Sequence, residues 1–132
     1  MKKDIPMPAV ENVSVAIVRE KPEGEEWNVY LVNLRGEELK NVLITSTGYG
    51  DIDGTPKKTS TLRHFFAAVP PNSYEKVEPI MEYTFGLSNE YWVSFSIGEQ
   101  MYDKRYVFLP ETIQESNFTQ VPIIGKKGVM IK

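Results

Sequence analysis

Cysteine is absent from this sequence of 132 residues, and the single histidine is His64. Without thiols the chain cannot form disulfides, thiolate metal sites or a cysteine nucleophile, so several classes of enzyme and metalloprotein are excluded. No apolar run approaches the roughly 20 residues that a membrane-spanning helix needs. The first eight residues also lack the apolar stretch that follows the positive charges of a signal peptide. We therefore expect a cytoplasmic protein without a membrane segment.

An excess of positive charge is also missing, because 15 Lys and Arg residues are set against 18 Asp and Glu residues, for a formal net charge of -3. Nucleic-acid-binding domains normally carry basic patches or stripes that neutralise phosphates. Positive charge concentrates only in the doublets Lys57-Lys58 and Lys126-Lys127, each of which could hold one phosphate. Two lysines neutralise too few phosphates for strong binding at physiological salt, so we do not expect nucleic acid to be the main partner.

Apolar residues alternate with polar residues along most of the chain, and this period of two places successive side chains on opposite faces of a strand. Turn-forming residues such as Pro22 and Gly24 separate the alternating runs. We predict strands over seven runs, namely 13–17, 27–34, 39–47, 59–69, 73–78, 91–97 and 102–109. The short connections predict that 27–34 pairs with 39–47, and that 91–97 pairs with 102–109, as antiparallel hairpins.

Seven to nine short strands with frequent turn signals favour an antiparallel sandwich, because a parallel sheet would need helices between its strands. We predict an all-β, immunoglobulin-like sandwich, with one short helical turn near residues 80–85. The chain is interpreted as one domain over residues 1–132. Residues 1–10 form an N-terminal extension, and residues 118–132 form a C-terminal strand or tail.

Three stretches carry a resemblance to a known family. Val29–Leu34, Leu39–Ile44 and Val69–Val77 resemble successive strands and turns of immunoglobulin-like adhesion and scaffold modules. The resemblance covers about half of the chain and implies a non-catalytic binding role. The sequence departs from antibody-type domains because it lacks both of their cysteines, and this leaves the strand topology open.

A second resemblance extends over nearly the whole chain. The blocks at 62–65, 78–82, 85–95 and 126–132 are similar to short bacterial proteins named as phenylalanyl-tRNA synthetase alpha subunits. That name would imply an accessory role with tRNA. The chain lacks the length of a synthetase catalytic domain and its arginine-bearing ATP-binding motif, so we do not expect synthetase activity.

Two stretches contain residue types that could bind a metal or act in catalysis. Asp51 and Asp53 lie among glycines as in a calcium loop, but the third oxygen ligand before the glycine and the glutamate at position twelve are missing, so we expect a solvated loop. His64 lies in a predicted strand without a nucleophile motif nearby, and we interpret it as an ordinary partly buried or edge histidine. We therefore expect no catalytic residues, no metal ligands and no cofactor.

Aromatic side chains supply the strongest indication of binding. If Tyr30, Trp92 and Tyr102 form an outward patch, they would mark a site for a protein partner, since exposed apolar patches usually do. Lys126 and Lys127 are further candidates for interaction. The apolar stretch from Val121 to Ile131 could act as an edge strand that pairs with another chain and allows self-association.

These observations lead to one function and two alternatives. We expect a non-catalytic interaction or scaffold module that binds a protein partner or a second copy of itself through a sheet edge or an aromatic face. The first alternative is an accessory protein associated with tRNA or another nucleic acid. The second is a small-molecule-binding barrel or an enzyme built around His64.

Overall fold

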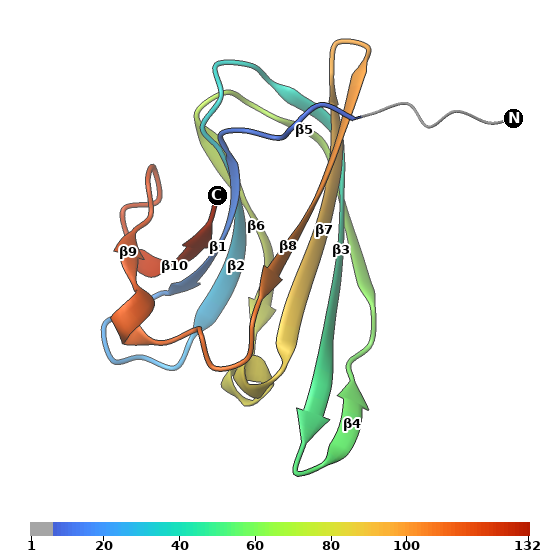
Figure 1. The fold of residues 1–132 in the computed structure, drawn as a ribbon. Helices are drawn as coiled ribbons and strands as arrows, with labels where there is room; N and C mark the ends of the chain where they lie inside the picture. Colours follow the sequence, from blue (N-terminus) through green and yellow to red (C-terminus); the bar gives the residue numbers. More distant parts are fainter. Residues whose placement is uncertain (1–6) are drawn as a thin grey trace, which may run out of the picture.

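The computed structural model describes residues 7–132, and its strands form two antiparallel sheets that face each other (Figure 1). The predicted all-β antiparallel sandwich is therefore confirmed. Of the predicted N-terminal extension, residues 1–6 lie outside the described residues, and residues 7–10 precede the first strand.

Each sheet is built from strands distant in sequence. Sheet A has the order β6 (Ser73–Ile80), β2 (Trp27–Asn33), β1 (Val13–Arg19), β10 (Lys127–Ile131) and β9 (Thr119–Gln120). Sheet B has the order β4 (Thr55–Lys58), β3 (Leu39–Ile52), β7 (Ser88–Ile97) and β8 (Gln100–Phe108), with β5 (Leu62–Val69) also paired to β3. The ten strands of residues 7–132 exceed the seven to nine predicted, because β4 and β9 are short additions beside longer strands.

Two short 3-10 helices interrupt the strands. The first, η1 (Glu82–Gly86), confirms the helical turn predicted near residues 80–85. Its Thr84 hydroxyl is buried and donates a hydrogen bond of 2.8 Å to the carbonyl of Met81, which stabilises the turn locally. The second, η2 (Glu115–Asn117), was not predicted and leads into β9.

The two predicted hairpins have different outcomes. β7 and β8 pair as expected, and the turn places Gly98 at a φ of 60°, which glycine adopts without steric cost. The predicted pairing of 27–34 with 39–47 is wrong, because β2 pairs with β1 and β6 while β3 pairs with β5 and β7. The chain instead crosses between the sheets after Asn33. The Asn33 amide holds this crossing by donating to the carbonyls of Glu37 and Pro70, both at 2.9 Å.

The glycine-rich stretch 48–54 is largely strand rather than a loop. β3 continues through it to Ile52 and then folds back on β4. Asp53 and Gly54 alone form the turn, with φ values of 53° and 79°. Two successive positive φ values are typical of the type I′ turn, for which Asp-Gly is a favoured pair. The turn thus explains the aspartate and the glycine without a metal.

The main hydrophobic cluster fills the space between the two sheets. Alternating residues of β1 and β2, such as Ile17 and Leu31, meet inward-facing residues of β3 and β7, such as Ile44 and Phe95. The Tyr106 hydroxyl of β8 donates a buried hydrogen bond of 2.6 Å to the carbonyl of Val13, and thereby links the sheets. Burial raises the pKa of Tyr106, so this hydroxyl stays protonated and keeps its role as donor.

A second apolar cluster lies on the outer face of sheet A. Ala16 and Val18 of β1 join Tyr30 and Val32 of β2, and Val121 covers them from the segment between β9 and β10. This cover explains why six consecutive residues of β1 are buried, since both of its faces are shielded. The outer face of β1 and β2 is therefore part of the folded interior, whereas Tyr74, Lys76 and Pro79 of β6 remain exposed.

Candidate interaction surface

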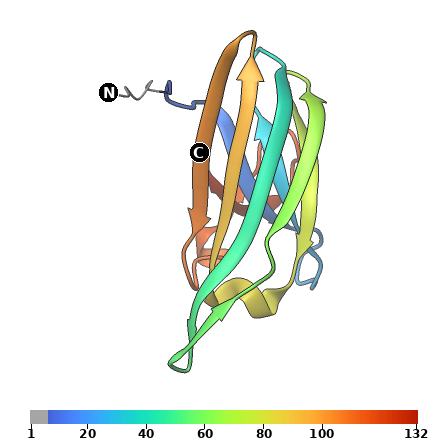
Figure 2. The same ribbon diagram turned by 90° about the vertical axis from the view of Figure 1, so that its right-hand side faces the viewer.

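The outer face of sheet B is uncovered in the part of the chain that the structure describes. Figure 2 shows β8, β7, β3 and β5 side by side from left to right, and no segment of residues 7–132 crosses in front of them. The side chains on this face are the ones that alternate with the core residues of the same strands. They therefore face solvent.

Three large apolar side chains occupy the middle of this face. Phe65 of β5 lies directly opposite Leu43 of β3, and Trp92 of β7 lies opposite Thr45, two residues further along β3. Phe65 is 61% exposed, Trp92 is 45% exposed and Leu43 is 40% exposed. We call Leu43, Phe65 and Trp92 the aromatic face of sheet B. Apolar groups that gather in register on one open surface are typical of binding sites.

Polar and charged groups surround Trp92. Its indole nitrogen donates a hydrogen bond to the carboxylate of Asp103 on β8. The guanidinium of Arg105 lies 5.9 Å from the centre of the ring, and its Nε is 3.7 Å from a carboxylate oxygen of Glu90. Arg63 is exposed on β5, where it faces Thr45 across the strand pair. Both signs of charge thus flank the apolar centre.

The structure does not bring together the three aromatic residues proposed from the sequence. Tyr30 belongs to the covered face of sheet A, where it is only 7% exposed and packs edge-on against Tyr74. Trp92 lies on the open face of sheet B. The predicted patch of Tyr30, Trp92 and Tyr102 is therefore wrong as a group, because these residues point to different sides of the two sheets.

Tyr102 faces the inside of the sandwich near one end. It lies opposite Phe95 on the neighbouring strand, and the two rings stack with centres 5.1 Å apart. The guanidinium of Arg35 lies 5.6 Å from the Tyr102 ring. The ring is partly buried and acts mainly as packing.

Lys126 and Lys127 are both exposed, but Lys126 already has a partner in this chain. Its ammonium group lies 2.7 Å from Oε1 of Glu20, and the other oxygen of Glu20 accepts hydrogen bonds of 2.6 Å from both Tyr30 and Asn28. Burial opposes the charge on Glu20, but the bonds from Lys126, Tyr30 and Asn28 outweigh it and lower the pKa from 4.5 to about 2. Lys126 therefore fastens the C-terminal segment over sheet A.

The C-terminal stretch 121–131 is used within the chain. β10 pairs with β1 through four residues, and β9 pairs with the start of β10. β9 pairs only with Lys127 and Gly128, so among the described residues Val129 to Ile131 pair with β1 alone. That this stretch pairs with a second chain stays a prediction.

His64 lies on β5 and is partly buried, in the position expected for it. Its Nε2 is 2.6 Å from Oε1 of Glu78, which also accepts a hydrogen bond of 2.9 Å from the hydroxyl of Ser46. The Glu78 carboxylate thus lies between Ser46 and His64. In a Ser-His-acid triad the histidine lies in the middle and contacts the serine, so this arrangement is not a triad. Among residues 7–132, no group of three His, Asp or Glu side chains is placed to hold a metal ion.

Sequence reasoning missed Leu43 and Phe65. Leu43 lies between Val42 and Ile44, which are fully buried, whereas Phe65 lies between His64 and Phe66, which are only partly buried. Alternation alone would have placed Leu43 on the outer face. Recognising the aromatic face also required the pairing of β3 with β5, which the sequence did not reveal.

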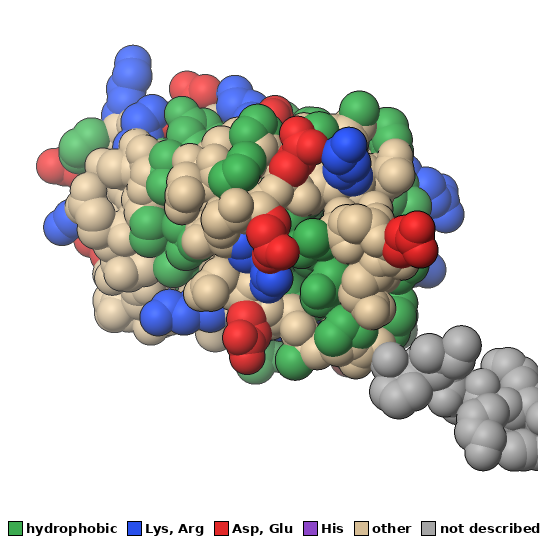
Figure 3. Space-filling view, turned by 90° about the horizontal axis from the view of Figure 1, so that it is seen from above, with side chains coloured by type: hydrophobic (Ala, Val, Ile, Leu, Met, Phe, Trp, Pro, Cys, Tyr) green, Lys and Arg blue, Asp and Glu red, His purple; other side chains and the backbone are tan. Residues whose placement is uncertain are grey.

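Two further surface properties bear on the choice of partner. At the end of the molecule seen in Figure 3, acidic and basic side chains are interspersed, and neither sign dominates that face. Within residues 7–132, neither helix has the length and apolar character that crossing a membrane would require.

No protein-family model matches the sequence, and no curated protein is significantly similar to it. The function therefore has to follow from the surfaces described above.

Proposed function

We propose that this protein is a non-catalytic binding module that recognises a protein partner through the aromatic face of sheet B. The observation that carries the proposal is the in-register exposure of Leu43, Phe65 and Trp92 on a face that the described chain leaves open. Exposed aromatic rings are the side chains that contribute most to binding energy at protein interfaces. They contribute little to the stability of the free protein.

The charges around these side chains support a protein partner rather than a nucleic acid. A protein interface has an apolar centre and a polar rim, and here Arg63 and Arg105 flank the centre together with Glu90 and Asp103. A nucleic-acid surface would present basic groups without nearby carboxylates. Arg105 instead lies within ion-pair distance of Glu90.

We also propose that the sandwich is immunoglobulin-like and that the protein works in the cytoplasm without a cofactor. Seven principal strands, β1, β2, β3, β5, β6, β7 and β8, take the places of strands A to G. The neighbours β1, β2 and β6 then correspond to A, B and E, and the neighbours β3, β7 and β8 to C, F and G. β5 departs from the antibody constant pattern because it pairs with β3 rather than β6. The absence of cysteine supports a reducing compartment.

The test compares proteins recovered from an extract of the native cell by the wild-type chain and by matched variants. Phe65→Ser removes the most exposed ring of the aromatic face, while Leu109→Ser removes an exposed apolar side chain that follows β8. We expect one protein to be recovered by the wild type and by Leu109→Ser. Its affinity for Phe65→Ser, measured with the purified partner, should be weaker by about tenfold or more.

Light scattering over a range of concentrations separates a second copy of this chain from a different partner. Concentration-dependent dimerisation that Phe65→Ser abolishes would assign the face to self-association. Equal recovery of every binding protein by Phe65→Ser and the wild type, together with a monomeric wild type, would contradict the proposal.

A further inference from the structure

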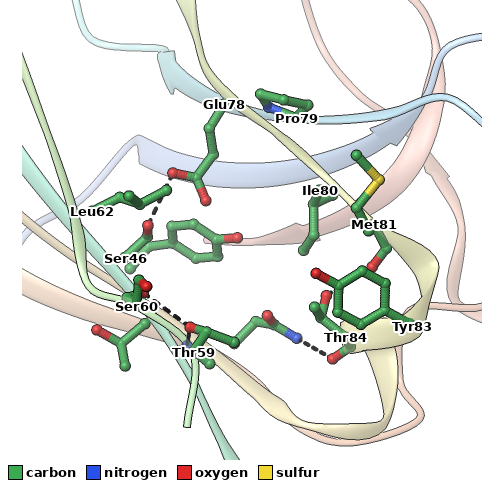
Figure 4. A pocket seen from close by; sticks show the side chains of 14 residues that line it. Ser46, Thr59, Ser60, Leu62, Glu78, Pro79, Ile80, Met81, Tyr83 and Thr84 are labelled. Carbon is green, nitrogen blue, oxygen red and sulfur yellow. Dashed lines mark hydrogen bonds between the residues drawn. The ribbon is translucent and has the colours of Figure 1, made fainter.

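A cavity of about 270 Å³ lies between the two sheets on the side where β5 and β6 face each other. Figure 4 shows Glu78 and Ile80 from β6 on one side of it, and Ser60 and Thr59 on the other. Met81, Tyr83 and Thr84 close a third side from η1 and the residue before it. Its floor includes Ser46 and Tyr91, which pair across β3 and β7. The cavity is slightly smaller than the roughly 300 Å³ at which typical small-molecule sites begin, so it suits only a very small ligand.

The carboxylate of Glu78 is held so that one oxygen stays available. Ser46 and His64 both contact Oε1, and no hydrogen bond within residues 7–132 engages Oε2. The side chain is only 12% exposed, yet it projects into the cavity (Figure 4). Two fixed contacts on one oxygen orient the carboxylate. The Glu78 side chain therefore loses less conformational entropy when a ligand binds.

Tyr91 is the second polar group on the wall. It is 2% exposed, and its hydroxyl has no hydrogen-bond partner among the described residues. Within residues 7–132, no side-chain nitrogen or oxygen atom is both sealed from solvent and unpaired, so this hydroxyl must open onto the cavity. The hydroxyl is therefore free to form a hydrogen bond with a molecule that enters the cavity.

The charge of the lining identifies the class of ligand. Glu78 is the one charged side chain on the cavity wall within the described residues, and the amide of Asn89 adds an acceptor oxygen because its nitrogen already donates to two carbonyls. Tyr83 and Met81 are exposed at the margin, where an aromatic ring and a polarisable thioether suit a cation or its alkyl chain.

We propose that this cavity is a binding site for a small organic ammonium ion, whose charge pairs with Glu78 and whose alkyl part lies against Met81 and Tyr83. The ammonium group would contact Oε2 of Glu78 and the hydroxyl oxygen of Tyr91. This site is separate from the aromatic face of sheet B. Failure of the ammonium site would therefore not contradict partner binding at that face, and the reverse also holds.

The test is a titration of the full chain followed by amide NMR, with n-butylammonium as the probe. Its neutral isostere n-butanol and the anion butyrate are the matched ligands. We expect saturable shifts for amides around Ser46, Glu78 and Tyr91, with a dissociation constant in the millimolar range that is typical of so small a ligand. Butanol should bind about tenfold more weakly, and butyrate should give no saturable shift.

Three variants connect the shifts to the cavity. Glu78→Gln should weaken butylammonium by about tenfold or more, while Glu99→Gln, which removes the same charge from the exposed turn between β7 and β8, should leave its affinity unchanged. Tyr91→Phe keeps the ring and should weaken binding severalfold. An unchanged amide spectrum away from the cavity verifies that each variant is folded. Absence of saturable shifts with the wild type, equal affinity for butanol, or undiminished binding by a folded Glu78→Gln would overturn the proposal.

Discussion

The outer faces of the two sheets differ in whether another part of the described chain covers them. On sheet A, Tyr30 and Val32 lie beneath the segment that joins β9 to β10, and the salt bridge from Lys126 to Glu20 fastens that segment. On sheet B, Phe65 and Trp92 occupy the corresponding outer positions and remain in solvent. The aromatic side chains of one outer face are thus buried, whereas those of the other are exposed to solvent in the described chain.

The difference separates residues that stabilise the fold from residues available for binding. Burial of apolar surface stabilises a protein by about 25 cal/mol per Å² removed from water, so the covered face contributes to folding. An open apolar face contributes nothing comparable until a partner covers it. Substitutions on the covered face should therefore lower the free energy of unfolding more than substitutions on the open face. The largest losses are expected in β10 and in the segment that joins it to β9.

Gly128→Ala should give the largest loss of stability. A Cβ atom at this position would lie 2.3 Å from the carbonyl oxygen of Ile17 and 2.9 Å from the Cα of Val18, and both are backbone atoms that cannot turn away. β10 would have to separate from β1 and would loosen the cover. We expect a loss of about 3 kcal/mol in the free energy of unfolding, measured with urea. Gly36→Ala, where a Cβ atom meets nothing within 4 Å, is the control and should change little.

Val121→Ala should have the next largest effect. Val121 is fully buried against sheet A, and shortening it leaves a cavity beneath the covering segment. We expect a loss of about 2 kcal/mol in the same measurement. Leu43→Ala removes a larger side chain from the open face and should cost about 0.5 kcal/mol or less. If the two losses were equal, the faces would not differ as described.

Glu20 makes the cover dependent on pH. Its pKa is about 2 in the folded protein against 4.5 ordinarily, so the unfolded state binds the proton more tightly. The stabilisation is complete above about pH 5 and is lost as the pH falls toward 2. After allowance for solvent screening, we expect a contribution of about 1 kcal/mol. Glu20→Gln should remove this contribution at neutral pH and flatten the acid dependence of urea unfolding between about pH 5 and pH 2. An acid dependence equal to that of the wild type would contradict this role.

Phe65→Ser should have the smallest effect on stability. The side chain is mostly in solvent and its removal opens no cavity, so we expect a change within about 0.5 kcal/mol. The same substitution is the one expected to weaken partner binding by about tenfold or more. A loss above about 2 kcal/mol would instead show that the ring is needed for the fold of sheet B.

The strand pattern was accessible from the sequence because each strand has one face toward a shared core. Val93 and Phe95, for example, alternate with Trp92 and Ser94, and this alternation identified β7 and its hairpin with β8. The alternation does not reveal which strands are neighbours. Leu39 to Ile44 therefore seemed a partner for β2, although the two strands lie in different sheets.

The candidate surface was harder to predict for a related reason. Tyr30 and Phe65 are both aromatic residues at outward positions, and nothing adjacent to either one in sequence distinguishes them. Their difference depends on Val121 and Lys126, about 90 residues from Tyr30 along the chain, which cover one sheet and not the other. Local pattern can identify a face, but only the long-range packing decides whether it is covered.

Hydroxyl-radical footprinting of the dilute monomer, read by mass spectrometry, tests this contrast most directly. Trp92 should be oxidised much faster than Trp27, which is buried in the core, and Phe65 should be modified while Tyr30 is protected. Oxidation of Tyr30 at a rate close to that of Trp92, or protection of both Phe65 and Trp92 in the monomer, would contradict a covered sheet A and an open sheet B.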